Sequence, residues 1–143
     1  MSSRHHALAL AAAFFLGCGG PPPRPPADMA PPAEIRGMVW VLTTLKGSAV
    51  TPGTRGAPTM QLGLGGSSLT GFGGCNRLGG SYTLDGTSLH IGQLVSTRMA
   101  CPDAMDLEAA FGATLAAVQG WRFAGADLEL MAGDTVLATL RRQ

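Results

Sequence analysis

Short segments in which apolar and polar residues alternate run through the chain from residue 36 onward. Met38–Leu45 is rich in β-branched and aromatic residues, Thr59–Leu64 has an apolar residue at every second position up to Leu64, and Ser68–Phe72 is a third such segment. Gly or Pro residues bound each segment. This pattern predicts short strands that are half buried on one face of a sheet.

Turn residues separate further pairs of strands in the second half of the chain. Gly at such positions supplies the positive φ that tight hairpins need. The turns are Asp85-Gly86-Thr87 between Tyr82–Leu84 and Leu89–Ile91, Gly125-Ala126-Asp127 between Trp121–Phe123 and Leu128–Leu130, and Gly133-Asp134 before Val136–Leu140. We therefore expect about eight short strands, mostly antiparallel.

One segment, about residues 103–119, changes to helical spacing. Its apolar stripe consists of Leu107, Phe111, Leu115 and Val118. Asp103 is the expected N-cap and Gly120 the expected left-handed stop, while Asp106 and Glu108 suit the positive end of the helix dipole. The expected fold class is α+β, with this helix on the concave face of a curved, mostly antiparallel sheet.

The first residues predict export. Ala7–Leu16 is an uninterrupted apolar run behind Arg4, and it is about half of the ~20 residues that a membrane-spanning helix needs. Phe15-Leu16-Gly17-Cys18 resembles the lipobox of bacterial lipoproteins, which implies acylation of Cys18 and a lipid anchor. Gly19 implies, by the same resemblance, an outer-membrane destination facing the periplasm. An ordinary signal peptide with a secreted product is the alternative.

Composition divides the chain into three segments, and its small net charge argues against strongly charged partners. Residues 1–18 form the expected signal peptide, residues 19–35 a Pro-rich extended spacer, and residues 36–143 one folded domain. The chain has 10 basic and 9 acidic residues and a net charge of +1. Neither nucleic-acid binding nor a polybasic membrane contact is therefore expected.

Two sequence blocks resemble one family. They are Gly73-Gly74-Cys75-Asn76-Arg77, followed by Gly80-Ser81-Tyr82, and Leu94-Val95-Ser96-Thr97-Arg98-Met99-Ala100-Cys101-Pro102. Together with Glu108 and Phe111 they are similar to the META domain, also called the HslJ-like domain. The resemblance covers about residues 36 to 142.

This resemblance implies a small α+β domain without an established enzymatic activity, linked with heat-inducible expression and antibiotic tolerance in bacteria. The family fold is similar to the cracked β-barrel of secretin pilot lipoproteins, some of which hold an acyl chain in a cavity. Fold similarity does not fix function. The family motif residues, expected to serve structure or binding, are Gly74, Asn76, Arg77, Tyr82, Thr97, Arg98 and Met99.

With Cys18 assigned to the lipobox, Cys75 and Cys101 remain as an even pair in an oxidising compartment. We expect them to form a disulfide, and two separately buried thiols are the alternative. A bridge closing a loop of about 26 residues contributes roughly 3 kcal/mol on the chain-entropy model. Their spacing is not that of a metal site, and no metal or cofactor is expected.

The Gly-rich stretch before Cys75 does not open into a helix, so a tight turn is favoured over a phosphate loop, with Asn76 satisfying backbone groups in it. For Arg77 and Arg98 we favour hydrogen bonds to carbonyl groups or to Asp103, and an anion site is the alternative.

Catalytic chemistry has few candidates. His90 is the one histidine of the expected domain, and a hydrolase would have to combine it with Ser81 or Ser96. A protease inhibitor-like module is an equally remote alternative. The sequence therefore favours a non-enzymatic envelope lipoprotein that is stress- or antibiotic-tolerance-related and contacts protein or lipid at the outer membrane.

An acyl-chain or small-ligand carrier is the main alternative to that function. Flexible methionine side chains suit an adaptable cavity, although plain core packing is the commoner role of such residues. The candidates for lining such a cavity are Met38, Met60, Met99 and Met105.

Overall fold

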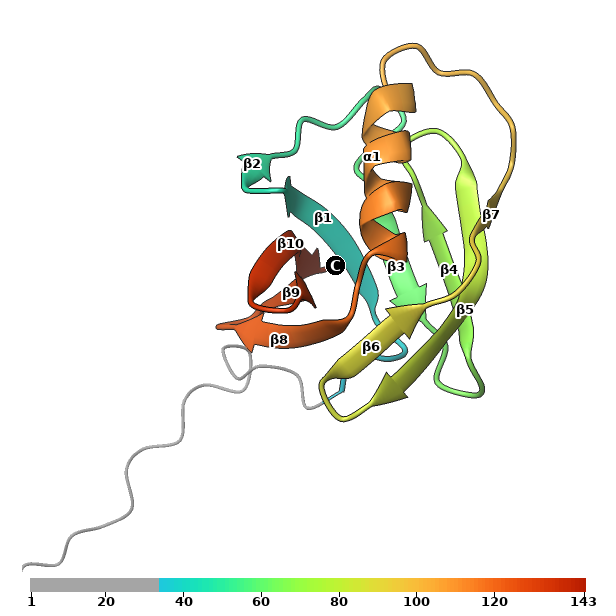
Figure 1. Ribbon diagram of the computed structural model, residues 1–143. Coiled ribbons are helices and arrows are strands. Elements are labelled where there is room, and N and C mark those ends of the chain that lie inside the picture. The colour runs from blue at the N-terminus through green and yellow to red at the C-terminus, as the bar shows by residue number, and fades with distance from the viewer. Residues whose placement is uncertain (1–33) are drawn as a thin grey trace, which may run out of the picture.

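The computed structural model describes residues 34–143, which form ten strands and one helix (Figure 1). The elements are β1 (Val39–Leu45), β2 (Ser48–Ala49), β3 (Thr59–Leu62), β4 (Ser68–Phe72), β5 (Arg77–Asp85), β6 (Ser88–Ile91), β7 (Val95–Ser96), α1 (Met105–Ala116), β8 (Gly120–Ala124), β9 (Asp127–Ala132) and β10 (Thr135–Arg142). The predicted hairpin turns all occur, and Gly86, Gly125 and Gly133 have the positive φ expected of them.

The strands form one antiparallel sheet that almost closes on itself. Its order is β10-β9-β8-β6-β5-β4-β3-β1-β2, and β1 also pairs with β10. Between β6 and β8 the ladder has one residue pair, Ser88 with Gly120. Helix α1 lies over this weak side of the sheet (Figure 1). The expected α+β fold, a cracked barrel with one helix, is therefore confirmed.

Side chains fill the interior of this barrel. Trp40, Phe111 and Leu115 are fully buried, and Val118 is 2% exposed, so three positions of the predicted helix stripe enter the core. Leu107 packs against the same cluster while partly exposed. The helix closes the cracked side because its apolar stripe replaces the missing strand pairs.

The helix is shorter than predicted and begins and ends differently. Ala104 stands at the N-cap without a side-chain hydrogen bond, and Asp103 instead accepts a hydrogen bond from the Thr54 backbone N–H at 2.7 Å. The C-cap Ala117 is right-handed, and Gly120 begins β8 without a positive φ. The predicted cap and stop were therefore wrong, because tertiary contacts to the 53–56 turn and to β9 determine both ends.

Other boundaries also moved. Leu64 lies outside β3 and is 70% exposed, because the chain turns after Leu62. Ile35, placed in the spacer by composition, is fully buried, and its carbonyl accepts a hydrogen bond from Trp40 Nε1 at 2.9 Å. The two-residue strands β2 and β7 raise the strand count above the expected eight.

Candidate functional site

The two motif blocks meet at one end of the barrel. The first forms the tight turn between β4 and β5, and the second forms β7 and the connection from β7 to α1. Both lie at the end of the molecule where α1 begins (Figure 1). This motif end is therefore built from residues about 25 positions apart, and packing brings them together.

Asn76 is the centre of the contacts at the motif end. Its side chain is 2% exposed. Nδ2 donates to the Met99 carbonyl at 3.0 Å and to Glu108 Oε1 at 2.8 Å, while Oδ1 accepts from Thr97 Oγ1 at 2.9 Å and from the Met99 N–H at 2.6 Å. One buried amide thus joins both motif blocks and the helix. Asn76 was expected to satisfy backbone groups of its own turn, but its side chain binds the Met99 backbone in the second block, because Glu108 already accepts from the N–H groups of the turn.

Glu108 reaches from α1 into the first motif block. Its Oε2 accepts hydrogen bonds from the backbone N–H groups of Asn76 at 2.6 Å and Cys75 at 3.2 Å. A Cβ at Gly73 would lie 2.5 Å from this carboxylate, and Gly74 has a φ of 110°. The two glycines are needed here because one leaves room for Glu108 and the other turns the chain.

The remaining links at this end are a backbone ladder and a covalent bond. Thr97 N–H donates to the Arg77 carbonyl at 3.2 Å, and Arg77 N–H donates to Thr97 Oγ1 at 3.1 Å. Cys75 and Cys101 form a disulfide with a Cα–Cα distance of 5.8 Å, and both are buried. The motif loops are therefore rigid at their base.

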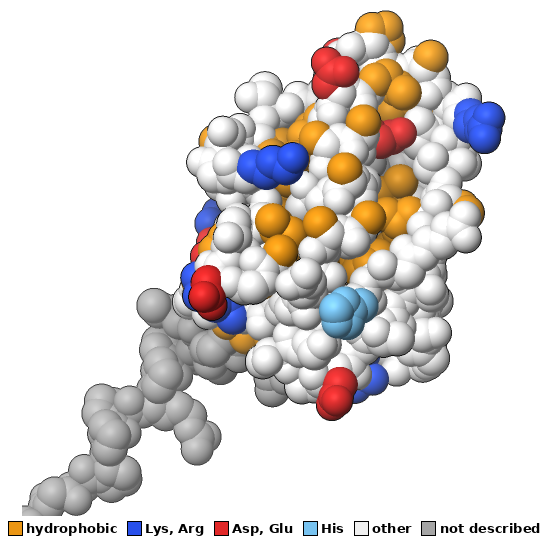
Figure 2. All heavy atoms as spheres, viewed as in Figure 1, with side chains coloured by type: hydrophobic (Ala, Val, Ile, Leu, Met, Phe, Trp, Pro, Cys, Tyr) orange, Lys and Arg blue, Asp and Glu red, His pale blue; other side chains and the backbone are white. Residues whose placement is uncertain are grey.

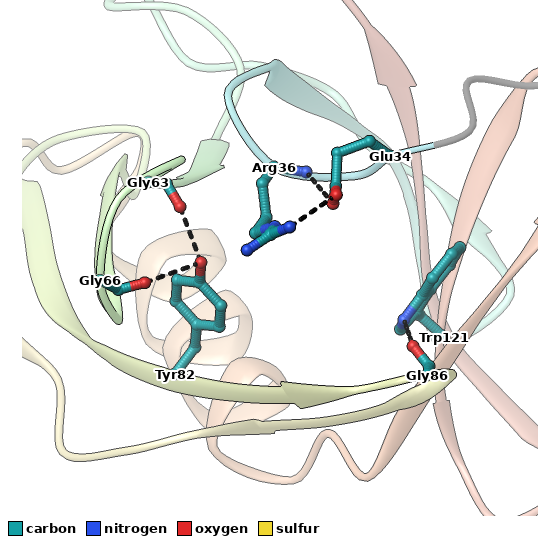
Figure 3. Close-up of polar contacts among 7 residues, drawn as sticks. All are labelled: Glu34, Arg36, Gly63, Gly66, Tyr82, Gly86 and Trp121. Carbon is teal, nitrogen blue, oxygen red and sulfur yellow. Dashed lines mark hydrogen bonds and ion pairs between the residues drawn. The ribbon is translucent and has the colours of Figure 1, made fainter.

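Tyr82, the remaining inward motif residue, lies away from the motif end, and its hydroxyl points at Gly63 and Gly66 in the turn between β3 and β4 (Figure 3). Its ring is buried, and its hydroxyl donates to the Gly63 carbonyl at 2.7 Å, with the Gly66 carbonyl 3.2 Å away. The Arg36 guanidinium lies close by and donates to Glu34 at 2.8 Å. That hydrogen bond lowers the pKa of Glu34 from 4.5 to about 2.

Arg77 and Arg98 point outward, and the expected network is not seen. Within residues 34–143 neither guanidinium donates a hydrogen bond or forms an ion pair, and the three ion pairs use Arg36, Arg122 and Arg141. Asp103, the expected partner, is bound by the Thr54 N–H, which lowers the pKa of its carboxyl.

An apolar groove separates α1 from β7. It has a volume of about 460 Å³ and is lined on the strand side by Leu94 and Val95 and on the helix side by Met105, Ala109, Ala113 and Ala116. Val95 and Met105, which line it, are 64% and 41% exposed. Figure 2 shows hydrophobic side chains gathered along one face of the molecule, over α1 and on both sides of it.

The hydrolase candidates lie in the β5–β6–β7 part of the sheet. His90 is opposite Thr83 in the β5–β6 ladder, so Ser81, two residues before Thr83, lies on the same face of the sheet as His90, while Ser96 in β7 is opposite Leu78. In the described part of the chain, no group of three potential metal ligands occurs. Met60 is fully buried and Met105 exposed, so the methionines do not line a shared cavity. Cys18 lies outside the described residues.

Sequence reasoning missed three features of this end. It assigned Glu108 to the helix dipole, and it did not single out Arg55 or the row of alanines on α1. The glycine pair opposite Glu108 was a usable signal, because paired glycines often mark the close approach of another group. Arg55 carried no signal, since a lone arginine in a loop has no pattern.

The fold and the motif end define a class: a small cracked-barrel α+β domain whose connecting loops are tied to its helix by a buried amide and a disulfide. The sequence model of the META domain matches residues 33–143, and the chain belongs to this family. No curated protein matches the chain. None of its described helices is long and apolar enough to span a membrane.

Two solved structures share the fold. An NMR structure of a protein from Burkholderia xenovorans is 26% identical, with a TM-score of 0.61, covering 85% of this chain and 98% of that one. A second NMR structure is 23% identical, with a TM-score of 0.59, covering 75% of this chain and 90% of the other.

Proposed function

We propose that this META-domain protein is a non-enzymatic lipoprotein, anchored through Cys18 in the outer membrane and facing the periplasm, that binds another envelope component through the α1–β7 groove. A role in stress or antibiotic tolerance is the physiological setting that the family resemblance suggests. The anchor rests on the lipobox and on the Pro-rich residues that follow it.

The observation that carries the binding role is the exposure of large apolar side chains along one groove. The exposed large hydrophobic side chains of residues 34–143 are Leu64, Val95, Met99 and Met105, and two of the four, Val95 and Met105, line this groove from its opposite sides. Clustered apolar surface of this kind marks interaction sites, because its exposure to water is costly. The small alanines of α1 leave the groove open for a partner's side chains.

An acyl chain is the second candidate occupant. The lining suits it, since the one charged group there, Glu108, already binds the motif turn. The barrel interior is filled by Trp40, Phe111 and their neighbours, so an acyl chain would lie in the surface groove and not inside the barrel.

The test places a photo-crosslinking amino acid at Val95 in the anchored protein in living cells. We expect a discrete protein adduct, which Ala113→Arg abolishes by filling the groove. Ala117→Arg is the matched control, because Ala117 is the exposed C-cap residue of the same helix and does not line the groove. A crosslinker at Leu64, exposed at the other end, should not give the same adduct.

The outcomes separate the candidates. A lipid adduct from Val95, with no protein adduct, favours the acyl-chain carrier. Equal adducts from Val95 and Leu64, or adducts that survive Ala113→Arg, contradict a groove-specific partner. The anchor is checked separately, because Cys18→Ser should move the protein from the membrane fraction to the soluble periplasmic fraction.

A further inference from the structure

We propose a second binding site, for an anionic phosphate or carboxylate group that carries an apolar chain, in a hollow beside the disulfide. The hollow has a volume of about 540 Å³, within the usual range of small-ligand sites. It is lined by Arg55, Phe72, Cys75, Arg77, Thr97 and Met99. It lies apart from the α1–β7 groove, with which it shares no lining residue.

Two guanidinium groups in this hollow lack a partner. Arg55 and Arg77 are exposed, and neither is in an ion pair or donates a side-chain hydrogen bond within residues 34–143. A guanidinium presents a planar fork of donors that matches phosphate and carboxylate oxygens. Two of them at one hollow therefore favour an anion.

Both arginines stand on fixed backbone. Arg77 is anchored by its two hydrogen bonds with Thr97. Arg55 lies in a turn closed by a hydrogen bond from Gly56 N–H to the Gly53 carbonyl at 3.1 Å, and Asp103 binds this turn at the Thr54 N–H. The Asp103 carboxylate at this turn thus accepts from a backbone donor and forms no ion pair with Arg55 within residues 34–143. A fixed backbone reduces the entropy lost when the guanidinium groups bind a ligand.

The rest of the hollow is apolar. Phe72 is the cross-strand partner of Arg77 in the β4–β5 ladder, so its ring lies beside the guanidinium on the outer face of the sheet. Met99 and the disulfide of Cys75 complete the lining. The ligand therefore needs an apolar part next to its charge.

The hollow continues along the barrel as an uncharged surface. A neighbouring hollow of about 430 Å³ shares Phe72 and Arg77 and extends over β3 and β4 to Val39. Its remaining lining is uncharged, with Thr59, Gln61 and Gly71 among its residues. An anionic head between Arg55 and Arg77 can thus direct a chain past Phe72 toward Val39.

The test titrates the full-length chain carrying Cys18→Ser, which removes its own acyl chains, with octyl phosphate below its micelle concentration. Binding is followed by calorimetry and by amide chemical shifts. We expect one saturable site, with shifts at Phe72, Arg77 and Thr97. Inorganic phosphate, which has no chain, and octyl glucoside, which has no charge, should each bind at least tenfold more weakly.

Charge-neutral variants assign the site. Arg55→Gln and Arg77→Gln should each weaken octyl phosphate binding about tenfold, and both arginines are exposed, so the fold is retained. Arg142→Gln removes the same charge from β10, which does not line the hollow, and should leave binding unchanged. Vesicles containing phosphatidylglycerol distinguish a membrane headgroup from a free amphiphile, since arginine-dependent vesicle binding indicates the membrane source.

Several results overturn the proposal. One is the absence of saturable binding to both octyl phosphate and vesicles, and another is equal binding of octyl phosphate by the wild type and both variants. The proposal is also overturned if inorganic phosphate binds as tightly as octyl phosphate, or if the chemical shift changes are confined to the α1–β7 groove. Only the last of these results concerns that groove, where it would favour the acyl-chain occupant. The others leave the proposed crosslinking partner untouched, so the two proposals fail separately.

Discussion

The two ends of the barrel are closed by different kinds of interaction. At the motif end, the buried Asn76 amide, the Glu108 carboxylate and a disulfide join two loops to the helix. At the other end, one Tyr82 hydroxyl binds carbonyls, and the Glu34–Arg36 pair has side chains 42% and 38% exposed. Water can replace an exposed ion pair but not a buried amide, so the motif end should contribute more stability.

Neighbouring residues of the motif end have different roles. Asn76 faces inward, while Arg77, directly after it, faces solvent, as do Arg98 and Met99 in the second block. The inward group fixes the loops, and the outward groups are available to bind. A motif can therefore be structural at one position and functional at the next.

The largest loss of stability at the motif end is expected from Asn76→Ala. It removes four side-chain hydrogen bonds and leaves Glu108 without one of its donors. We expect the free energy of unfolding to fall by about 4 kcal/mol, near the upper range of single substitutions. Urea denaturation followed by circular dichroism measures it.

Gln93→Ala is the matched control for the loss of an amide. Gln93 is exposed, and its side chain makes no hydrogen bond within residues 34–143, so its loss should change the unfolding free energy by less than about 0.5 kcal/mol. If the two variants unfold at the same urea concentration, the Asn76 contacts are not what closes the motif end.

The disulfide comes next in size. Replacing both Cys75 and Cys101 by Ala frees a loop with a sequence separation of 26. The loss of stability should be about 3 kcal/mol on the chain-entropy model. Reductant should destabilise the wild type toward the value of the double variant and leave that variant unchanged.

The disulfide and the Asn76 side chain hold the same loops, so the losses of stability caused by removing each of them should not add. Combining the double cysteine substitution with Asn76→Ala should cost less than the sum of the two. Strict additivity would indicate that the two links act on separate parts of the motif end.

Much of the fold was predictable because local patterns agree with it. The hairpin glycines, the alternation in β3 and β4 and the stripe of Phe111 and Leu115 each follow from chain geometry. The helix ends were not predictable, because Asp103 has a stronger partner in Thr54, which is distant in sequence. Strand β7, two residues long, is too short to show alternation.

The site was predictable only in its parts. The family resemblance indicated Asn76 and Thr97 as motif residues. The even number of cysteines that remain after Cys18 indicated the disulfide. That Asn76 joins Thr97, Met99 and Glu108 depends on packing between segments 20 or more residues apart. The pairing of Arg55 with Arg77 across one hollow likewise needs coordinates, since no local pattern relates a loop turn to the start of β5.

The smallest effect is expected from a substitution at the end of the barrel that holds Tyr82 and the Glu34–Arg36 pair. Hydrogen bonds from Arg36 lower the pKa of Glu34 from 4.5 to about 2, so this carboxylate stabilises the fold above about pH 4.5 and loses that contribution as the pH falls toward 2. Glu34→Gln should therefore lower the urea midpoint at pH 7 by much less than Asn76→Ala does. The gap between wild type and variant should close toward pH 2, and 1 M salt at pH 7 should narrow it.

Asp134→Asn is the control for this last measurement, because Asp134 is an exposed carboxylate without an ion pair in residues 34–143. Its difference from wild type should stay small and nearly constant with pH. A Glu34→Gln effect at pH 7 as large as that of Asn76→Ala would contradict the ranking of the two ends, because an exposed, salt-screened pair would then match a buried amide network. A gap that persists unchanged to pH 2 would instead assign the Glu34 contribution to packing and not to its charge.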